Sequence, residues 1–149
     1  MAPAQTVIDA IDAVIEDFNR RRLDLPDGFF DRKTQFVING APFETLLGQA
    51  PNDPLVLMLS RGPAGFRFTT KTLQHAVPDA KLERGEITSS PQSIALQLWL
   101  SGKLRGTGEA LNAVVAVTLK LAAAGYVEIA EATLDEPNLD KIRQARLRP

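Results

Sequence analysis

The sequence predicts an α+β fold in which helices gather on one side of a mainly antiparallel sheet. Apolar residues recur at helical spacing near the N-terminus, and four strand-like segments follow residue 80. The turns between these segments are short, which makes consecutive strands antiparallel neighbours. A length of 149 residues suits one domain, so a single compact core is expected over residues 1–149.

An amphipathic helix is expected over about residues 6 to 22. Four apolar residues recur there at helical spacing: Val7, Ile11, Val14 and Phe18. Asp12 and Glu16 are four residues apart on its polar face, with Asp17 beside them, which favours solvent over a paired-carboxylate site. The arginines at positions 20–22 fall in the last turn, where cations complement the helix dipole, and they are expected to be solvated.

The middle of the chain predicts shorter elements. Phe29 and Phe30 are expected to begin a second helix or turn, and residues 33–39 to form a strand closed by Gly40. Residues 41–48 fit either a short paired strand or a helical turn, and the sequence leaves both open. Residues 55–77 have a helical pattern, which the Gly-Pro-Ala-Gly run at 62–65 divides into two pieces at a bend.

Three or four strands are expected, over residues 81–88, 93–104, 111–121 and 126–134, followed by a closing helix that begins near Pro137. The hairpin from Leu98 to Leu121 carries apolar side chains on both faces of each strand. A strand covered on one side only alternates apolar and polar residues. Because the helices cover one face, the other face meets either solvent or another copy of the protein.

Composition excludes several classes of function. The 17 basic side chains balance 18 acidic ones, so no overall field attracts nucleic acid or an anionic membrane, and neither is expected as a partner. Cysteine is absent, which excludes disulfides and thiolate sites and agrees with a reducing compartment. No apolar run approaches the roughly 20 residues of a membrane span, and no secretory signal opens the sequence. We therefore expect a cytoplasmic protein.

Several local features together resemble the nuclear transport factor 2-like superfamily, especially its SnoaL-like and ketosteroid-isomerase-like members. The resemblance covers almost the whole chain as an order of elements. It depends on four short stretches at matching places: Phe36 to Gly40 (FVING), Ala76 to Ala80 (AVPDA), Gly106 to Glu109 (GTGE) and Ala124 to Ile129 (AGYVEI), the last leading to Leu134-Asp135 before the closing helix.

The resemblance implies a cone-shaped fold, with a strongly curved sheet wrapped around the N-terminal helices. It also implies a ligand pocket between the concave face of the sheet and the helices. Many members of the superfamily pair through the convex face of the sheet, and such pairing would cover the second apolar face of the hairpin. A homodimer through the sheet is therefore expected.

The catalytic residues of these relatives are not matched here. An isomerase-like base would fall near Asn39, its tyrosine near Val14 and its second acid near Ala116 or Val117. The carboxylates and arginine of limonene-epoxide-hydrolase-like relatives would fall near three apolar residues: Leu98, Leu100 and Ala132. A register error of one residue would reverse every side chain, but it offers no better set.

Four other positions carry alternatives. His75, near a helix end, is either a surface residue or a pocket acid or base, and Asn39 either satisfies its turn with Gly40 or orients a ligand. Trp99 either stacks on a ligand or fills the dimer interface. Arg61 and Arg67, beside the Gly-Pro-Ala-Gly bend, are either surface residues or hold a ligand carboxylate.

The sequence therefore predicts a protein that binds a small hydrophobic molecule, with no cofactor and no metal site. The expected ligand-binding residues are Val14, Phe18, Phe36, Ile38, Leu98, Trp99, Ala116 and Ala132. One alternative is an isomerase, cyclase or hydrolase with an atypical site that uses His75 and Asn39. Another is a dimeric protein-interaction module without a ligand. Whether the protein is an enzyme stays open.

Overall fold

The computed structural model describes residues 3–22, 29–42 and 61–145. Its elements are α1 (Pro3–Asn19), β1 (Phe30–Ile38), β2 (Ala41–Pro42), α4 (Gly62–Ala76), β3 (Lys81–Ser90), β4 (Ser93–Lys103), β5 (Ala110–Leu121), β6 (Val127–Thr133) and α5 (Glu136–Ala145). The strands form one sheet in the order β2-β1-β6-β5-β4-β3. Every neighbouring pair is antiparallel except β1 and β6, which are parallel.

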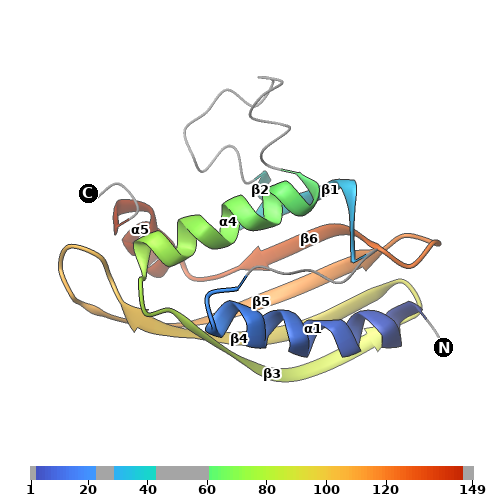
Figure 1. Cartoon of the computed structure of the whole chain (residues 1–149), viewed down its shortest axis with the longest axis horizontal. Helices are drawn as coiled ribbons and strands as arrows, with labels where there is room; N and C mark the ends of the chain where they lie inside the picture. Colours follow the sequence, from blue (N-terminus) through green and yellow to red (C-terminus); the bar gives the residue numbers. More distant parts are fainter. Residues whose placement is uncertain (1–2, 23–28, 43–60, 146–149) are drawn as a thin grey trace.

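The described helices lie on one side of the sheet (Figure 1). Helix α1 packs on β3 and β4, while α4 packs on β1 and against α5. The sheet is curved and open, so the predicted α+β fold with a mainly antiparallel sheet around the helices is confirmed. The four predicted C-terminal strands and the closing helix are also present, with ends that differ from the prediction by two residues or fewer.

The first strand begins earlier than predicted. Phe30 already pairs with Val127 of β6, so the expected helix or turn at Phe29 and Phe30 is wrong. The register then shifts before Gln35, and this bulge bends β1. Thr34, which is 1% exposed, closes the bulge: its hydroxyl donates to the carbonyl of Val127 and accepts from the Asp31 backbone N–H at 2.9 Å.

The two alternatives for the segment after β1 are resolved only at its start. Residues 41 and 42 form β2, which pairs with β1. Residues 43–48 lie outside the described part of the chain, as does the predicted first helical piece up to residue 60. The Gly-Pro-Ala-Gly run opens α4, with Pro63 in the first turn, where its missing N–H is tolerated.

The arginine run after α1 is not simply solvated, which corrects the prediction for Arg21. Its guanidinium donates to the carbonyl oxygens of Pro78 and Ala80, both at 2.7 Å, and lies over the Phe18 ring. This contact ties the end of α1 to the turn that follows α4. Nearby, the Asn19 side chain exchanges two hydrogen bonds with the backbone of Leu82, at 2.8 and 2.9 Å, and so occupies part of the β3 edge.

Asp135 caps α5 and makes its stability pH-dependent. Its carboxylate accepts the Asn138 side-chain amide at 2.7 Å and the Asn138 backbone N–H at 3.0 Å, and these bonds hold the pKa of Asp135 below its usual value. A lowered folded-state pKa stabilises the fold above the unfolded-state pKa, and that contribution is lost as the pH falls. We expect Asp135→Ala to lower the melting temperature at pH 7 and to have a smaller effect at pH 3.

Thermal unfolding at both pH values checks this expectation. Asp140→Ala, on the same helix, is the control, because Asp140 pairs with Arg143 rather than with free backbone N–H groups. An Asp135→Ala effect that is the same at both pH values would contradict the capping role.

Candidate ligand-binding site

The register of the sheet determines which side chains face the helices. On β4 the even-numbered residues face inward, with Ile94, Leu96 and Leu100 buried. On β5 the odd-numbered residues do so, since Leu98 lies opposite Val115 and Leu100 opposite Ala113. The pairing carries this inner face across to the last two strands, where it includes Ala130 and Ala132 of β6 and Phe36 and Ile38 of β1.

Buried residues on the inner face form two separate clusters. One cluster lies under the first half of α1 and includes Val7, Ile11, Ile94, Leu119 and Val127. The other lies where α1, α4 and α5 end, and includes Phe18, Ala76, Leu100, Leu111 and Ala145. Most of the fully buried core therefore lies toward the two ends of the inner face.

The middle of the inner face is apolar but only partly buried. We call it the central patch; it consists of Ile38, Leu98, Val115, Val117, Ala130 and Ala132. These residues are contiguous, because Leu98 lies opposite Val115, and Ala132 lies between Val117 and Ile38. Leu98, Val117 and Ala130 pack against the first cluster and Val115 against the second, so the patch joins the two clusters while part of its apolar surface stays exposed.

The two longest described helices cover different margins of the inner face. Helix α1 covers β3 and β4, and α4 covers β1, so the two helices lie over opposite margins of the sheet (Figure 1). At one end they approach each other, where the Gln74 amide of α4 donates to the Phe18 carbonyl of α1 at 3.4 Å. We call the region of the inner face over the central patch, between α1 and α4, the inner trough; the patch extends over four neighbouring strands.

Three aromatic rings pack together near the start of β1. Phe30 contacts Phe36 and Phe66 with ring centroids 5.2 and 5.4 Å apart, and the first of these contacts is edge to face. Phe30 and Phe66 are partly exposed. The strand residues of the central patch are all apolar, so in the described part of the chain the sheet supplies no ionisable group to the floor of the trough.

The predicted ligand-binding residues divide between several locations. Ile38, Leu98 and Ala132 belong to the central patch, Phe36 lies beside it, and Val14 is partly exposed on α1. Phe18 is 2% exposed and fills the core. Ala116 and Trp99 lie on the outer face, because their strand neighbours Val115, Val117, Leu98 and Leu100 point inward. These two residues therefore lie on the opposite face of the sheet from the central patch, and for Trp99 this position favours the dimer-interface alternative.

Asn39 has a structural role that the sequence only partly indicated. It follows β1 with φ of +50°, a left-handed conformation that asparagine tolerates, so it does form the turn with Gly40. Its amide also donates to the Leu134 carbonyl at 2.8 Å and accepts the Leu134 N–H at 2.9 Å. A further bond reaches Glu136. With both ends of its amide engaged, Asn39 holds the segment before α5 rather than presenting a free group to a ligand.

We expect Asn39→Gly to lower the free energy of unfolding by about 2 kcal/mol, because two hydrogen bonds to backbone are lost while glycine keeps the left-handed conformation. Asn39→Ala should cost more, since alanine also resists this conformation. Urea denaturation of both variants measures the two effects. A glycine variant as stable as the original protein would show that the side-chain bonds contribute nothing.

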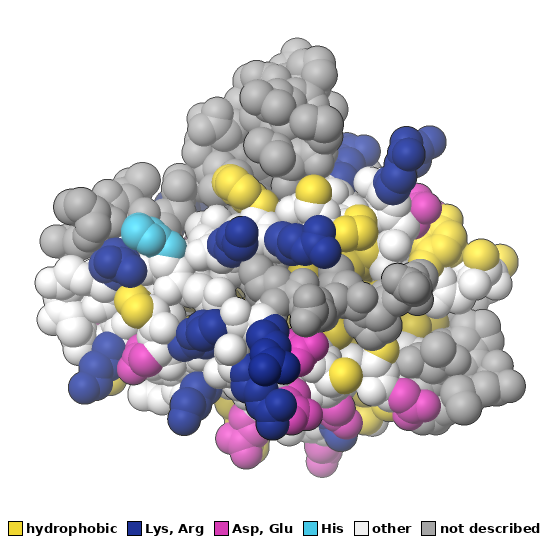
Figure 2. Space-filling model, in the orientation of Figure 1, with side chains coloured by type: hydrophobic (Ala, Val, Ile, Leu, Met, Phe, Trp, Pro, Cys, Tyr) yellow, Lys and Arg dark blue, Asp and Glu magenta, His cyan; other side chains and the backbone are white. Residues whose placement is uncertain are grey.

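His75 and the arginines lie outside the trough floor. His75 is exposed on the last turn of α4, where its backbone carbonyl accepts the Arg105 Nε at 2.6 Å. Arg61 precedes α4 and is partly exposed, and Arg67 is exposed on α4. Basic side chains spread over α4 and below it, whereas acidic ones gather along the α1 and β3 side (Figure 2).

A groove of about 640 Å³ lies at one end of β3, β4 and β5, and its lining includes outer-face side chains of these strands. Trp99 and Val114 lie directly opposite each other there and are 49% and 51% exposed. Lys81, Glu83, Ser101 and Asn112 also line it. The sequence indicated apolar side chains on both faces of these strands. Trp99 and Val114 are large, exposed apolar residues of the outer face.

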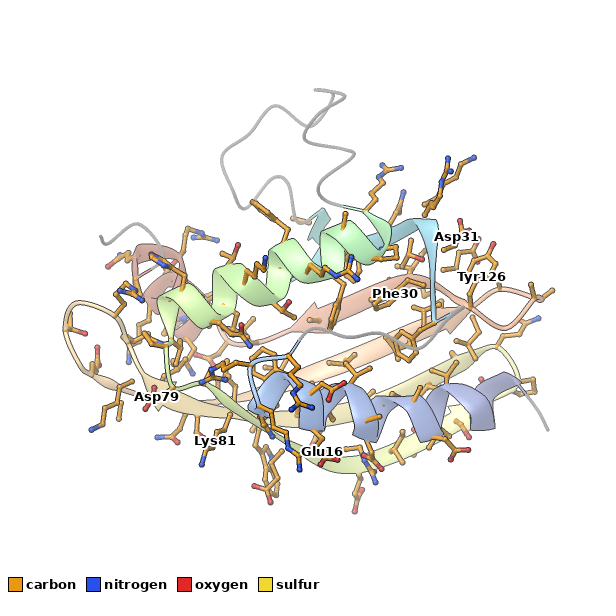
Figure 3. All side chains as sticks on the ribbon, viewed as in Figure 1. Glu16, Phe30, Asp31, Asp79, Lys81 and Tyr126 are labelled. Atoms are coloured by element: carbon orange, nitrogen blue, oxygen red, sulfur yellow. The ribbon has the colours of Figure 1, made fainter. Side chains whose placement is uncertain are left out.

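A smaller polar groove, of about 360 Å³, lies at the β1 bulge. Its lining includes Asp31, Lys33, Gln35, Tyr126 and Glu128. Figure 3 shows Asp31 and Tyr126 near each other at the end of the sheet where β1 begins. Tyr126 therefore contributes to this groove. It is not part of the central patch, to which Ala132 and Leu98 belong.

Two further observations concern the described residues as a whole. Among the described residues, no three histidine, cysteine, aspartate or glutamate side chains are placed to share a metal ion. Within the same part of the chain, no helix is both long and apolar enough to cross a membrane.

The fold is that of SnoaL-like structures. A curved open sheet, covered on one face by helices, matches solved SnoaL-like structures over almost the whole chain, which is consistent with the nuclear transport factor 2-like superfamily. The predicted resemblance is thus confirmed at the level of the fold. No protein-family model matches the sequence, and no curated protein matches it.

Solved structures supply the particular comparisons. The chain is similar to a SnoaL-like polyketide cyclase from Agrobacterium tumefaciens, with a TM-score of 0.65 and 16% identity over 91% of this chain and 95% of that one. It is also similar to TerC, co-crystallised with polyporic acid, with a TM-score of 0.67 and 13% identity over 93% and 98%. SalBIII, an epoxide hydrolase/cyclase-like enzyme of salinomycin pyran-ring formation, has a TM-score of 0.63 and 13% identity over 93% and 97%.

Proposed function

We propose that this protein binds a small hydrophobic molecule in the inner trough. The observation that carries the proposal is the central patch, six contiguous apolar side chains that point toward the helices yet reach solvent. An apolar floor with few polar groups is the usual design of a site for such ligands. The partly exposed rings of Phe30 and Phe66 add aromatic surface beside the patch, which favours a ligand with a ring system.

Ligand binding is favoured over acid–base catalysis. General acid–base chemistry needs a titratable group within hydrogen-bond reach of the reacting atom. The resemblance implies that the isomerase and hydrolase carboxylates would fall near Asn39, Leu98 and Ala132, and none of these side chains is an acid or a base. The cyclase and epoxide hydrolase/cyclase-like neighbours keep a cyclase or hydrolase reaction as the alternative, with catalytic groups from outside the sheet.

Alanine methyl groups provide a direct test of the binding site. The protein is labelled at alanine methyls and titrated with neutral two-ring and three-ring aromatic compounds, after a thermal-shift screen selects those that raise the melting temperature. We expect the resonances of Ala130 and Ala132, on the inner face, to shift. Ala95 and Ala116, on the outer face of neighbouring strands, are the matched controls. The proposal fails if no compound binds or if only the outer pair responds.

A second candidate function, self-association, is favoured by the exposed pair on the outer face. Trp99 and Val114 are large, apolar and about half exposed, and a homodimer interface is more apolar than ordinary surface. Lys81 and Glu83 lie beside them with opposite charge, so two copies related by a twofold axis can place each lysine near the other's glutamate. A second copy of the chain is therefore the proposed partner.

We expect Trp99→Glu to shift the protein toward monomer, with the dimer at least about tenfold weaker, because it places a charge in the apolar centre of the interface. Sedimentation velocity over a range of concentrations measures this. Phe68→Glu, which alters an exposed apolar side chain on α4 in the helical layer, is the control. A wild-type protein that stays monomeric at high concentration would rule out self-association.

A further inference from the structure

The polar groove at the start of β1 lies where two bulges meet. The ladder between β1 and β6 shifts register after Phe30, where four residues of β1 correspond to one residue of β6, Glu128. Glu128 is also the extra residue of a bulge between β6 and β5. Bulges re-aim side chains and interrupt pairing, and they are over-represented next to functional sites. The groove of about 360 Å³ is therefore a place where the sheet locally opens.

The backbone of the groove is held from both sides. Thr34, which is 1% exposed, bonds the carbonyl of Val127 and the Asp31 backbone N–H. Gly62 of α4 lies so close to the backbone of the bulge that an added Cβ would clash with it. The Asp31 carboxylate also accepts the Lys33 backbone N–H at 3.1 Å, which fixes its direction. A site held in this way loses little freedom when a ligand binds.

The lining of the groove carries charges of both signs. Asp31 and Glu128 are acidic and Lys33 is basic, and within the described residues none of the three has an ion pair. Lys120 and Glu131, on the outer face of β5 and β6 nearby, do pair with each other, at 3.2 Å. The charges in the groove are thus available to a ligand that carries both a positive and a negative group.

The rest of the lining is suited to a small apolar group. Tyr126 and Ile129 are partly buried and provide an aromatic ring and an aliphatic side chain. Figure 3 shows the side chains of Tyr126 and Asp31 near each other. The volume lies at the lower end of the range of ligand pockets, so the ligand is small.

We propose that the polar groove binds an α-amino acid with an apolar side chain. The ammonium group of the ligand pairs with Asp31 and Glu128, its carboxylate pairs with Lys33, and its side chain contacts Tyr126 and Ile129. A simple amine leaves Lys33 unpaired beside a second cation, whereas a zwitterion satisfies charges of both signs. Hydrogen bonds between ionised groups are stronger than those between neutral ones, so they select for this ligand class. This site is separate from the inner trough and goes beyond the proposed function.

Three probes test which charges of the ligand are recognised. They are L-leucine; 3-methylbutylamine, which is leucine without its carboxylate; and 4-methylpentanoate, which is leucine without its ammonium group. All three present the same branched side chain. We expect the wild-type protein to bind leucine at least about tenfold more tightly than either analogue, measured by calorimetric titration at neutral pH and low salt.

Two substitutions should remove these preferences one at a time. Asp31→Asn keeps an oxygen that can accept the Lys33 N–H but removes the negative charge, so the preference for leucine over 4-methylpentanoate should fall to about threefold or less. Lys33→Gln removes the positive charge and should reduce the preference for leucine over 3-methylbutylamine in the same way. Each variant should keep the other preference.

Asp79→Asn is the matched control. The Asp79 carboxylate also accepts a backbone N–H, that of Lys103 at 2.7 Å, but Asp79 lies at the opposite end of the sheet from Asp31 (Figure 3). This variant should keep both preferences, and thermal unfolding confirms that each variant is folded. A wild-type protein that does not bind leucine, or binds it no more tightly than either analogue, would overturn the proposal. An Asp31→Asn variant with the wild-type preferences would do the same.

Discussion

Replacing Gly62 by alanine should destabilise the protein by about 3 kcal/mol, because the substitution combines backbone strain with a clash. Gly62 has φ of +65° at the start of α4, a conformation that L-residues with a side chain resist. A Cβ there would lie 2.7 Å from the Arg32 carbonyl oxygen and 2.9 Å from the Asp31 carbonyl oxygen, both on the backbone of the β1 bulge. Backbone atoms cannot rotate away, so the helix must shift off the strand.

Gly108→Ala separates the two causes. Gly108 has a similar φ of +70°, but a Cβ there would meet no atom within 4 Å. It should therefore report the conformational strain alone, about 1 to 2 kcal/mol. Urea denaturation of both variants measures the difference, which is the cost of the helix–strand clash. Equal effects at the two positions would contradict the close packing of α4 on the bulge.

Filling the trough should abolish ligand binding. Ala132→Phe adds a ring at the middle of the central patch, between Val117 and Ile38. We expect the affinity for the aromatic compounds selected by thermal shift to fall more than about a hundredfold, because the added ring occupies the space of the ligand and the sheet beneath it is too well packed to yield. Calorimetric titration measures the loss.

Ala116→Phe makes the same chemical change on the outer face of the adjacent strand and should leave binding unchanged. Stability provides an independent check. Overpacking a filled core costs about 1 to 3 kcal/mol, whereas a ring placed into an open recess costs less and gains apolar burial. An Ala132→Phe variant that is strongly destabilised would show a filled core at this place, and one that binds normally would exclude the trough as the site.

The sequence determined much of the fold through local patterns. Helical spacing located α1, and the short turns after β3, β4 and β5 dictated an antiparallel order. The start of β1 shows the limit of local patterns. No local pattern at Phe29 and Phe30 predicted a strand, because the strand there exists only through pairing with Val127, nearly a hundred residues away in the chain.

The site was predictable only in part for the same reason. Alternation showed that Leu98 and Leu100 share a face and that Trp99 belongs to the other. It did not show which of Val115 and Ala116 would face the helices, because both faces of β5 carry apolar residues. The pairing of Leu98 with Val115 decided the matter, and it moved Ala116 to the outer face. If every second residue of β5 were polar, the sequence would have shown which face of this strand meets the helices.

Arg21 shows the limit of reasoning from local sequence. It belongs to the polar side of an amphipathic pattern, and that pattern predicts solvent for it. Periodicity thus determined which residues are apolar together and in what order the elements occur. Only the tertiary structure decided which polar side chain meets a partner from a distant segment, as Arg21 does at Pro78 and Ala80. Local spacing encodes the elements, whereas contacts between distant segments exist only once the sheet and helices have packed.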